Sequence, residues 1–420
     1  MTGPERPDRL DRRLGTADAV VIGLGSMIGA GVFAAFGPAA RAAGSGVLAA
    51  LLLAAVVAYC NAVASAQLAA SYPESGGSYV YGRRRLGTWW GFVAGWGFVV
   101  GKTASCAAMA LTFAAYAVPG HPLGQRLAGV AAVLVLAGLN YRGVSKTAAL
   151  SRVLVSLSLL TLAVLVGAIW SGRHSAGQVS LPGSGGVPGL LQAAGLLFFA
   201  FAGYARIATM GEEVRDPGRT IPRAIPLALG IAVVVYAVVG VSALAAAGPA
   251  GLAAAHAPLA AAVHAAGVGS VAPVVRIGGA VASLGALLAL IAGIGRTSLA
   301  MARNRDLPGW LAAVHPRFRV PHRAELALAG VVSVLVLSTD LRPVIGFSSF
   351  GVLVYYAIAN AAAFSQPADA RRWPRALNVL GLLGCLVLVV SLPVASVLAG
   401  LAMFAVGLAG RALVLWRRAG

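Results

Sequence analysis

Apolar residues form long blocks, separated by short polar segments, from residue 16 to near the C-terminus. A helix of about 20 apolar residues crosses the ~30 Å hydrocarbon core of a bilayer. The pattern therefore predicts twelve membrane-spanning helices, at residues 16–41, 47–71, 88–118, 123–140, 148–170, 189–211, 225–247, 274–302, 325–339, 344–364, 377–392 and 394–415. Pro393 is expected to act as a tight turn between the last two, and one long kinked span is the alternative interpretation.

The first block has an unusual number of glycines in its middle. Four of them fall within nine consecutive positions: Gly23, Gly25, Gly29 and Gly31. Glycine in a helix interior costs about 0.5–1 kcal/mol relative to alanine. At membrane depth, an interrupted helix is tolerated only where its freed N–H and C=O groups face protein, water or a ligand. We therefore predict a helix interruption here, with a partner interruption in the glycine-containing block at residues 190–210.

The composition leaves no room for a soluble domain. The chain has 420 residues, of which 59% are hydrophobic and 10% charged, and its longest polar stretches are loops. Residues 1–13 are polar and lack the apolar region of a signal peptide. The three cysteines lie inside apolar blocks and are expected to be buried and reduced: Cys60, Cys106 and Cys385.

The net charge of +20 would indicate a nucleic-acid partner in a soluble protein. Here most of the positive residues, including the triplet Arg83, Arg84 and Arg85, lie in the loops of one side. This is the distribution of the positive-inside rule. It predicts a multi-pass protein of the plasma (inner) membrane with both termini in the cytoplasm, with the lipid bilayer and not nucleic acid as its partner.

The order of the spans indicates an internal repeat. The first interrupted span is followed by four more, and the second interrupted span begins the same pattern. An odd number of spans per repeat makes the two halves antiparallel, as in transporters with inverted repeats. The predicted organisation is a cytoplasmic tail (1–15), a first repeat (16–171), a second repeat (189–365) and two additional helices (376–416).

Four local patterns occur in order along the chain. They are G-S-M-I-G-A-G-V-F at residues 25–33, Y-P-E-S-G-G-S-Y at 72–79, F-F-A-F-A-G-Y-A-R-I-A-T-M-G-E-E-V-R-D-P at 198–217 and R-T-S-L-A-M-A-R-N-R-D-L-P at 296–308. Together they resemble the amino acid–polyamine–organocation (APC) family of permeases. This resemblance implies an all-α membrane protein with the LeuT-type fold, which moves amino acids or related amines by alternating access.

The first interruption supplies candidate substrate-binding residues: Ser26, Met27, Ile28, Gly29, Ala30 and Gly31. A helix that restarts offers free N–H groups at its positive end, which suits the carboxylate of an amino acid. The residues before the break offer free carbonyl groups to the ammonium, and the Ser26 hydroxyl is a further candidate. The alternative is that these glycines only allow close helix packing.

In the sixth span, Ala202 and Gly203 are the predicted break. Phe199 stands four residues before the glycine, where related permeases place an aromatic gate, although an ordinary packing role is the alternative. Many relatives carry an acid two residues after the glycine, whereas this chain has Ala205 followed by Arg206. This departure argues against a cationic substrate.

Lys102 lies in the middle of the third span, about 20 Å from its start at ~1.5 Å per residue. An ionisable residue at this depth is functional by default. Some proton-coupled relatives carry such a lysine in the fifth span, where this chain has Ser158. Our hypothesis is that Lys102 carries the coupling proton. The alternatives are a static tether for carbonyls of a broken helix and a counter-charge for the substrate carboxylate.

Arg206, Glu212 and Glu213 are candidates for a gate or a structural ion pair near the cytoplasmic end of the sixth span. The histidines lie in loops without i, i+4 pairs, so we expect no metal site and no cofactor. No catalytic set is apparent inside the spans, which argues against an enzyme. The sequence thus predicts a secondary active amino acid transporter coupled to protons, with an uncoupled exchanger or facilitator of the same fold as the alternative.

Overall fold

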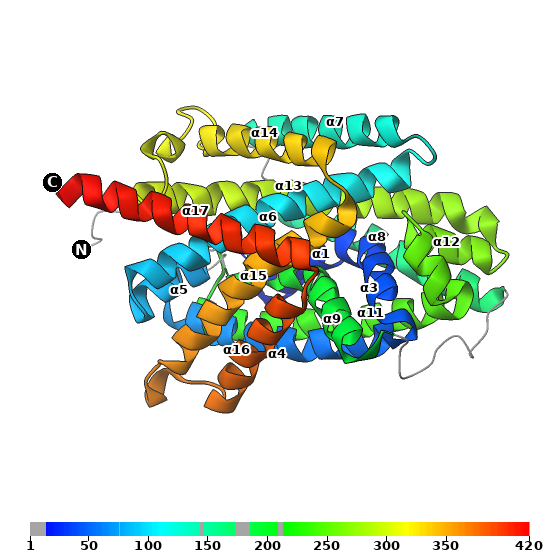
Figure 1. The fold of residues 1–420 in the computed structure, drawn as a ribbon, viewed down its shortest axis with the longest axis horizontal. Helices are drawn as coiled ribbons and strands as arrows, with labels where there is room; N and C mark the ends of the chain where they lie inside the picture. The colour runs from blue at the N-terminus through cyan, green and yellow to red at the C-terminus, as the bar shows by residue number, and fades with distance from the viewer. Residues whose placement is uncertain (1–13, 75, 143–146, 173–184, 209–212, 420) are drawn as a thin grey trace.

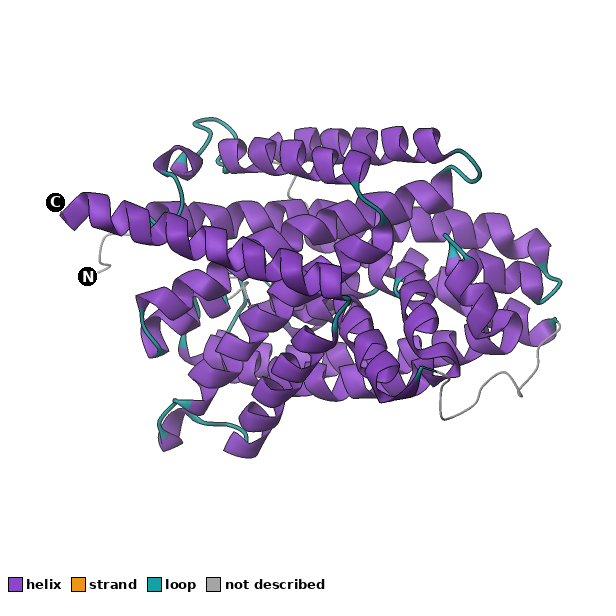
Figure 2. Ribbon diagram, in the orientation of Figure 1, coloured by secondary structure: helices purple, strands orange, loops and turns teal. Residues whose placement is uncertain are grey.

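A computed structural model describes residues 14–74, 76–142, 147–172, 185–208 and 213–419. Regular structure in these residues is helical (Figure 2), apart from an isolated parallel bridge between Leu14 and Val214. The long helices are α4 (Val47–Ser71), α6 (Thr88–Ala117), α7 (Pro122–Tyr141), α8 (Thr147–Ser171), α9 (Gly186–Phe201), α11 (Pro217–Ala254), α13 (Ala272–Arg303), α14 (His322–Ser338), α15 (Leu341–Phe364), α16 (Arg375–Ser391) and α17 (Val394–Ala419). The first span is divided into α1 (Thr16–Met27), α2 (Ala30–Ala34) and α3 (Phe36–Ala43), and the shorter helices are α5 (Ser78–Arg85), α10 (Ala205–Ala208) and α12 (Pro258–Ala265).

Ten helical segments of the described chain are long and apolar enough to cross a membrane. This confirms an all-α polytopic membrane protein. Helices α14 and α16 occupy the predicted ninth and eleventh spans, but each has 17 residues. Such a helix is about 26 Å long, slightly less than the hydrocarbon core. Helix α16 ends at Ser391 and α17 begins at Val394, so the last two spans are separate helices and not one kinked helix.

Both predicted interruptions are present. Helix α1 ends at Met27, and α2 restarts at Ala30 after Gly29, whose φ of −129° and ψ of −137° are not helical. Helix α9 ends at Phe201 and continues through a 3-10 turn, η3 (Ala202–Tyr204), into α10. The second interruption is therefore a tightened turn, which is milder than the first.

Two helical segments lie outside the predicted spans. Helices α5 and α12 occur where only loops were expected. The seventh span is also longer than predicted. Pro217 begins α11, since the first helical position does not require an N–H, and α11 passes a kink at Gly248, where φ is +65°.

The interrupted helices lie inside the bundle. Helix α1 packs against α11, and α9 packs against α4. Helices α7 and α14 pack together on one side of the molecule, at the top of Figure 1, while α17 runs along the outside of α6 and α15. The residues of the two interruptions are accordingly surrounded by protein, as a break at membrane depth requires.

Candidate substrate-binding site

The two interruptions meet through their backbones at Gly203. A Cβ added to Gly203 would lie 2.2 Å from the Ser26 carbonyl oxygen and 2.6 Å from the Met27 nitrogen. Gly31 makes a similar contact, because its added Cβ would lie 2.6 Å from the Ala200 Cα. Some glycines of the predicted site are therefore needed for close packing between the two broken helices, as the packing alternative expected.

Tyr236 of α11 joins the same two elements through its side chain. Its hydroxyl oxygen lies 2.6 Å from the Met27 carbonyl oxygen and 3.0 Å from the Ala200 carbonyl oxygen. A tyrosine hydroxyl has one proton, so the two carbonyls share this donor. Tyr236 is 1% exposed, so these carbonyls have little access to water.

The first interruption also satisfies part of its own backbone. The Gly29 N–H donates to the Met27 carbonyl at 2.9 Å, and the Ile28 N–H donates to the Leu24 carbonyl at 2.6 Å. In this conformation Gly29 and Met27 are therefore paired with each other. The roles predicted for them, donor to the substrate carboxylate and acceptor from its ammonium, require this hydrogen bond to open.

A cavity of about 40 Å³ lies beside the interruptions. Six predicted residues line it: Ser26, Lys102, Phe199, Ala202, Gly203 and Arg206. Predicted residues Met27, Gly29, Ala30 and Gly31 are not among its lining residues. Since a water molecule needs about 10–15 Å³ of such space, the cavity holds a few waters and no amino acid. The conformation is closed, and a substrate requires the surrounding helices to move apart.

A second cavity, of about 20 Å³, lies on the other side of Ser26. Ser26, Ala286 and Ala289 line both cavities, and Ile28 lines the second. Ser158, at the position of the lysine in some proton-coupled relatives, also lines the second cavity and donates to the Leu154 carbonyl at 2.8 Å. This chain instead has a lysine next to the interruptions on a different helix, since Lys102 of α6 lines the first cavity.

Lys102 reaches the second interruption directly. Its Nζ donates to the carbonyl oxygen of Ala202 at 3.1 Å, and the side chain of Lys102 is buried. The Tyr356 hydroxyl lies 3.4 Å from the same oxygen. Ala202 is the first residue of the 3-10 turn, so Lys102 binds a carbonyl at the break. This geometry is that of the tether considered from the sequence, and it brings an ionisable group of α6 into contact with the second interruption.

Phe199 lines the cavity, whereas its neighbours have other contacts. The Phe198 ring packs edge-on against Tyr356, and the Phe201 ring packs against Tyr236 at 5.1 Å. Of the three phenylalanines near the break, Phe199 therefore has the position that a gate requires.

Glu213 forms an ion pair with Arg296 of α13, with 2.6 Å between Oε1 and Nη1. From the sequence, Arg206, Glu212 and Glu213 are candidates for a gate or a structural ion pair. Arg206 lines the cavity from α10, and Arg296 is the partner of Glu213 on α13. Glu212 lies outside the described residues.

Sequence reasoning missed Tyr236 and Tyr356, which contact the two interruptions. A signal for both was available, because a tyrosine within an apolar span needs a partner for its hydroxyl. It also missed Phe98, Met109 and Leu290, which supply much of the apolar wall of the first cavity.

Interrupted helices that meet at a cavity inside a helical membrane bundle are the binding architecture of secondary transporters. The fold and the site therefore define the protein as a member of the class of secondary transporters. The chain belongs to the amino acid permease family, whose sequence profile matches residues 14–412. This confirms the resemblance to the APC permeases.

Individual relatives agree with this assignment. The chain is 60% identical over 416 residues to the uncharacterized transporter Rv1999c of Mycobacterium tuberculosis (strain ATCC 25618 / H37Rv), covering 98% of this chain and 94% of the relative. It is 31% identical over 386 residues to the chloroplastic cationic amino acid transporter 7 of Arabidopsis thaliana, covering 86% of this chain and 66% of the relative. It is 25% identical over 430 residues to the branched-chain amino acid permease BcaP of Bacillus subtilis (strain 168), covering 95% of this chain and 92% of the relative. The family and these relatives identify a transporter and not an enzyme.

Proposed function

We propose that this protein is a secondary active transporter that binds an amino acid between its two interrupted helices and couples its movement to protons. The observation that carries the proposal is the contact of Gly203 with the Ser26–Met27 backbone beside a cavity that holds Lys102. When these helices separate, their freed N–H and C=O groups become available to the carboxylate and ammonium of a substrate.

The cavity wall favours a neutral amino acid. Its apolar side chains include Phe98, Met109 and Leu290, and none of its described lining residues is acidic. Lys102 and Arg206 are positively charged and would repel the side chain of a cationic amino acid, so a cationic substrate is disfavoured. Among the relatives, the branched-chain permease is the better guide to the substrate, and the cationic transporter is the weaker one.

Lys102 supplies a route for coupling. While protonated, its ammonium holds the Ala202 carbonyl at the second break. A neutral amine is a weaker donor, so loss of the proton loosens the turn at the second break from α6. We propose that binding and release of this proton accompany opening of the site. The competing proposal is an uncoupled exchanger or facilitator, in which Lys102 is only a tether.

The helix contacts support two inverted repeats, at residues 16–171 and 189–365. The first repeat contains α1, α4, α6 and α8, and their counterparts in the second repeat are α9, α11, α13 and α15. If the repeats correspond, the contact between α1 and α11 should have an equivalent between α9 and α4. In the same way, the contact between α6 and α15 should have an equivalent between α13 and α8. All four contacts are present.

The remaining proposals concern the ends of the chain and its orientation. We propose that residues 1–15 form a tail and that 376–416 add two outer helices. We also propose that the arginine-rich end of the bundle faces the cytoplasm of a plasma membrane.

Substitution of Lys102 tests the coupling. The protein is placed in liposomes, after a thermal-shift screen of the twenty amino acids has identified a substrate. We expect Lys102→Gln to lose accumulation driven by a pH gradient while it retains exchange of labelled for unlabelled substrate. The variant Thr112→Ala, also on α6 but not among the residues that line the cavity, is the control and should keep both activities. Accumulation by Lys102→Gln at the wild-type level would contradict proton coupling through this residue.

A further inference from the structure

A third, much larger cavity lies away from the interruptions, at the end of the bundle that carries α5 and the end of α17. Its volume is about 680 Å³, and its walls come from α6, the segment after α13 and α17. The charged residues that line it are Arg83, Arg305, Asp306 and Arg411. Three guanidinium groups and one carboxylate leave an excess of two positive charges.

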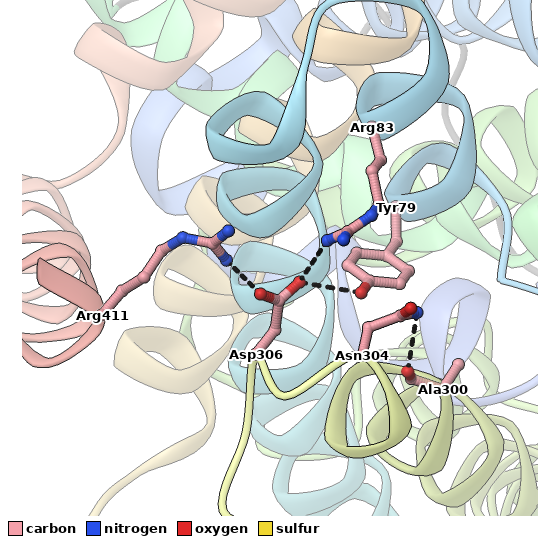
Figure 3. Close-up of polar contacts among 6 residues, drawn as sticks. All are labelled: Tyr79, Arg83, Ala300, Asn304, Asp306 and Arg411. Carbon is pink, nitrogen blue, oxygen red and sulfur yellow. Dashed lines mark hydrogen bonds and ion pairs between the residues drawn. The ribbon is translucent and has the colours of Figure 1, made fainter. Parts of the chain in front are cut away.

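The carboxylate organises the positive groups. The Asp306 side chain is 5% exposed and accepts hydrogen bonds from Arg411, from Arg83 Nη1 at 3.2 Å and from the Tyr79 hydroxyl at 2.8 Å (Figure 3). Burial and the hydrogen bond to Asp306 raise the pKa of Tyr79, so the phenol remains a donor. Asp306 thus fixes two arginines, on α5 and α17, without neutralising both.

Arg411 has donor capacity left over. Its side chain is 8% exposed, and its guanidinium lies 4.7 Å from the ring centre of Phe92 and 5.0 Å from that of Trp89. Its buried Nε has no hydrogen-bond partner within the part of the chain that the structure describes. A buried, unpaired guanidinium donor is costly unless an acceptor from outside the chain completes it.

An apolar cavity continues from the basic one. It has a volume of about 220 Å³, and its wall includes Val99, Ile294 and Leu328. Trp96 and Leu307 line both cavities, so the two adjoin. Together they form a site that is positively charged at one end and apolar at the other.

Exposed tryptophans beside the basic cavity indicate the level of a membrane interface. Four exposed tryptophans come from the chain segments beside it: Trp89, Trp90, Trp310 and Trp416. Tryptophans concentrate at the boundary between head groups and hydrocarbon. The apolar cavity lies further along α6, at Val99 and Thr103, and hence deeper in the hydrocarbon region.

We propose that this pair of cavities binds an anionic phospholipid. Its phosphate is bound by Arg83, Arg305 and Arg411, and an acyl chain passes Trp96 into the apolar cavity. Basic pockets between membrane helices are known binding sites for anionic head groups, and guanidinium groups suit phosphate oxygens. The site is separate from the proposed amino acid site, and the proposal does not depend on transport.

Two pairs of variants test this with little risk to folding. Arg305 and Arg319 are both exposed and have positive φ angles, +60° and +57°, so glycine suits the backbone at either position. Of these two arginines, only Arg305 lines the cavity. Gly410 and Gly230 are both helical glycines whose added Cβ would meet no atom within 4 Å, and Gly410 lines the cavity. Arg305→Gly and Gly410→Leu are therefore matched by the controls Arg319→Gly and Gly230→Leu.

The experiment titrates the purified full-length protein in detergent with phosphatidylglycerol, phosphatidylcholine or inorganic phosphate and follows the unfolding midpoint. We expect phosphatidylglycerol alone to raise the midpoint. Arg305→Gly should weaken its apparent affinity about fivefold, the equivalent of the ~1 kcal/mol that one arginine contributes near an anionic membrane. Gly410→Leu should abolish the effect, and both controls should retain it. An equal response to phosphatidylcholine, a full response to inorganic phosphate, or a test variant that matches its control would overturn the proposal.

Discussion

At the residue scale, the closed state is held by a few buried polar side chains that contact backbone carbonyls. Tyr236 contacts Met27 and Ala200, and Lys102 contacts Ala202. These carbonyls lie at or next to the C-terminal ends of α1 and α9, where the last carbonyl groups of a helix have no partner within the helix. Since an unpaired buried carbonyl costs about 1–3 kcal/mol, each contact stabilises the arrangement more than an ordinary surface hydrogen bond.

Tyr236→Phe should therefore destabilise the protein. The change removes one hydroxyl without leaving a large cavity, so the expected loss is about 1–3 kcal/mol of unfolding free energy. Unfolding in a mild detergent, followed by heat or denaturant, measures it. Tyr59→Phe is the matched control, because Tyr59 is 43% exposed, and it should change stability by less than about 0.5 kcal/mol. Equal stability of the two variants would show that the Tyr236 hydroxyl does not support the interruptions.

At the element scale, the sequence predicted the interruptions but not their contact. The clustered glycines in the first span and Gly203 in the sixth are poor helix formers, and this signal is local. The approach of Gly203 to Ser26 depends on residues far apart in the chain. Helix α5 was missed for a different reason, because its eight residues are too few for a periodic pattern.

The glycine contact gives a prediction at this scale. Gly203→Ala forces two backbones apart, because the new Cβ would lie 2.3 Å from the Ser26 carbonyl carbon. Overpacking of this kind costs about 1–3 kcal/mol, and we expect transport to be lost with it. Gly230→Ala, in open space on α11, is the control and should stabilise the protein by about 0.5–1 kcal/mol. Normal stability and transport in Gly203→Ala would contradict the close contact.

At the scale of the whole molecule, two contacts close the arginine-rich end of the bundle. Leu14 and Val214 form a backbone bridge, in which the Arg215 N–H donates to the Leu14 carbonyl at 2.8 Å. This bridge joins the segments before α1 and after α10. Beside it, Glu213 pairs with Arg296 of α13. We infer that α1 and α10 move as one unit, which the Glu213–Arg296 pair holds against α13.

Glu213→Gln should favour opening at this end. We expect faster maleimide labelling of a cysteine introduced by Ser26→Cys, because Ser26 lines the cavity and the native cysteines Cys60, Cys106 and Cys385 are buried. A partly buried pair of this kind contributes about 1 kcal/mol, which corresponds to an increase of roughly fivefold in the open population. Glu74→Gln, which removes the exposed pair with Arg84, is the control. Equal labelling rates in the two variants would exclude Glu213 from gating.

The overall topology was the most predictable feature. Hydrophobic blocks of membrane length are a strong local signal, and they predict where most of the long helices lie. The Asp306 cluster was not predictable in this way, because Tyr79, Arg83 and Arg411 meet it from helices separated by hundreds of residues. Such side-chain constellations arise from tertiary packing and leave no periodic signal.

The central claim is that an amino acid binds at the cavity between the two interrupted helices. Gly293 lines this cavity, and an added Cβ there would meet no atom within 4 Å, so Gly293→Leu is expected to fill the site without disturbing the fold. The most direct measurement is the shift of the unfolding midpoint by each of the twenty amino acids, in the wild type, in Gly293→Leu and in the control Gly230→Leu. We predict that at least one neutral amino acid stabilises the wild type and the control and has no effect on Gly293→Leu. Stabilisation of all three proteins to the same extent, or of none of them by any amino acid, would contradict the claim.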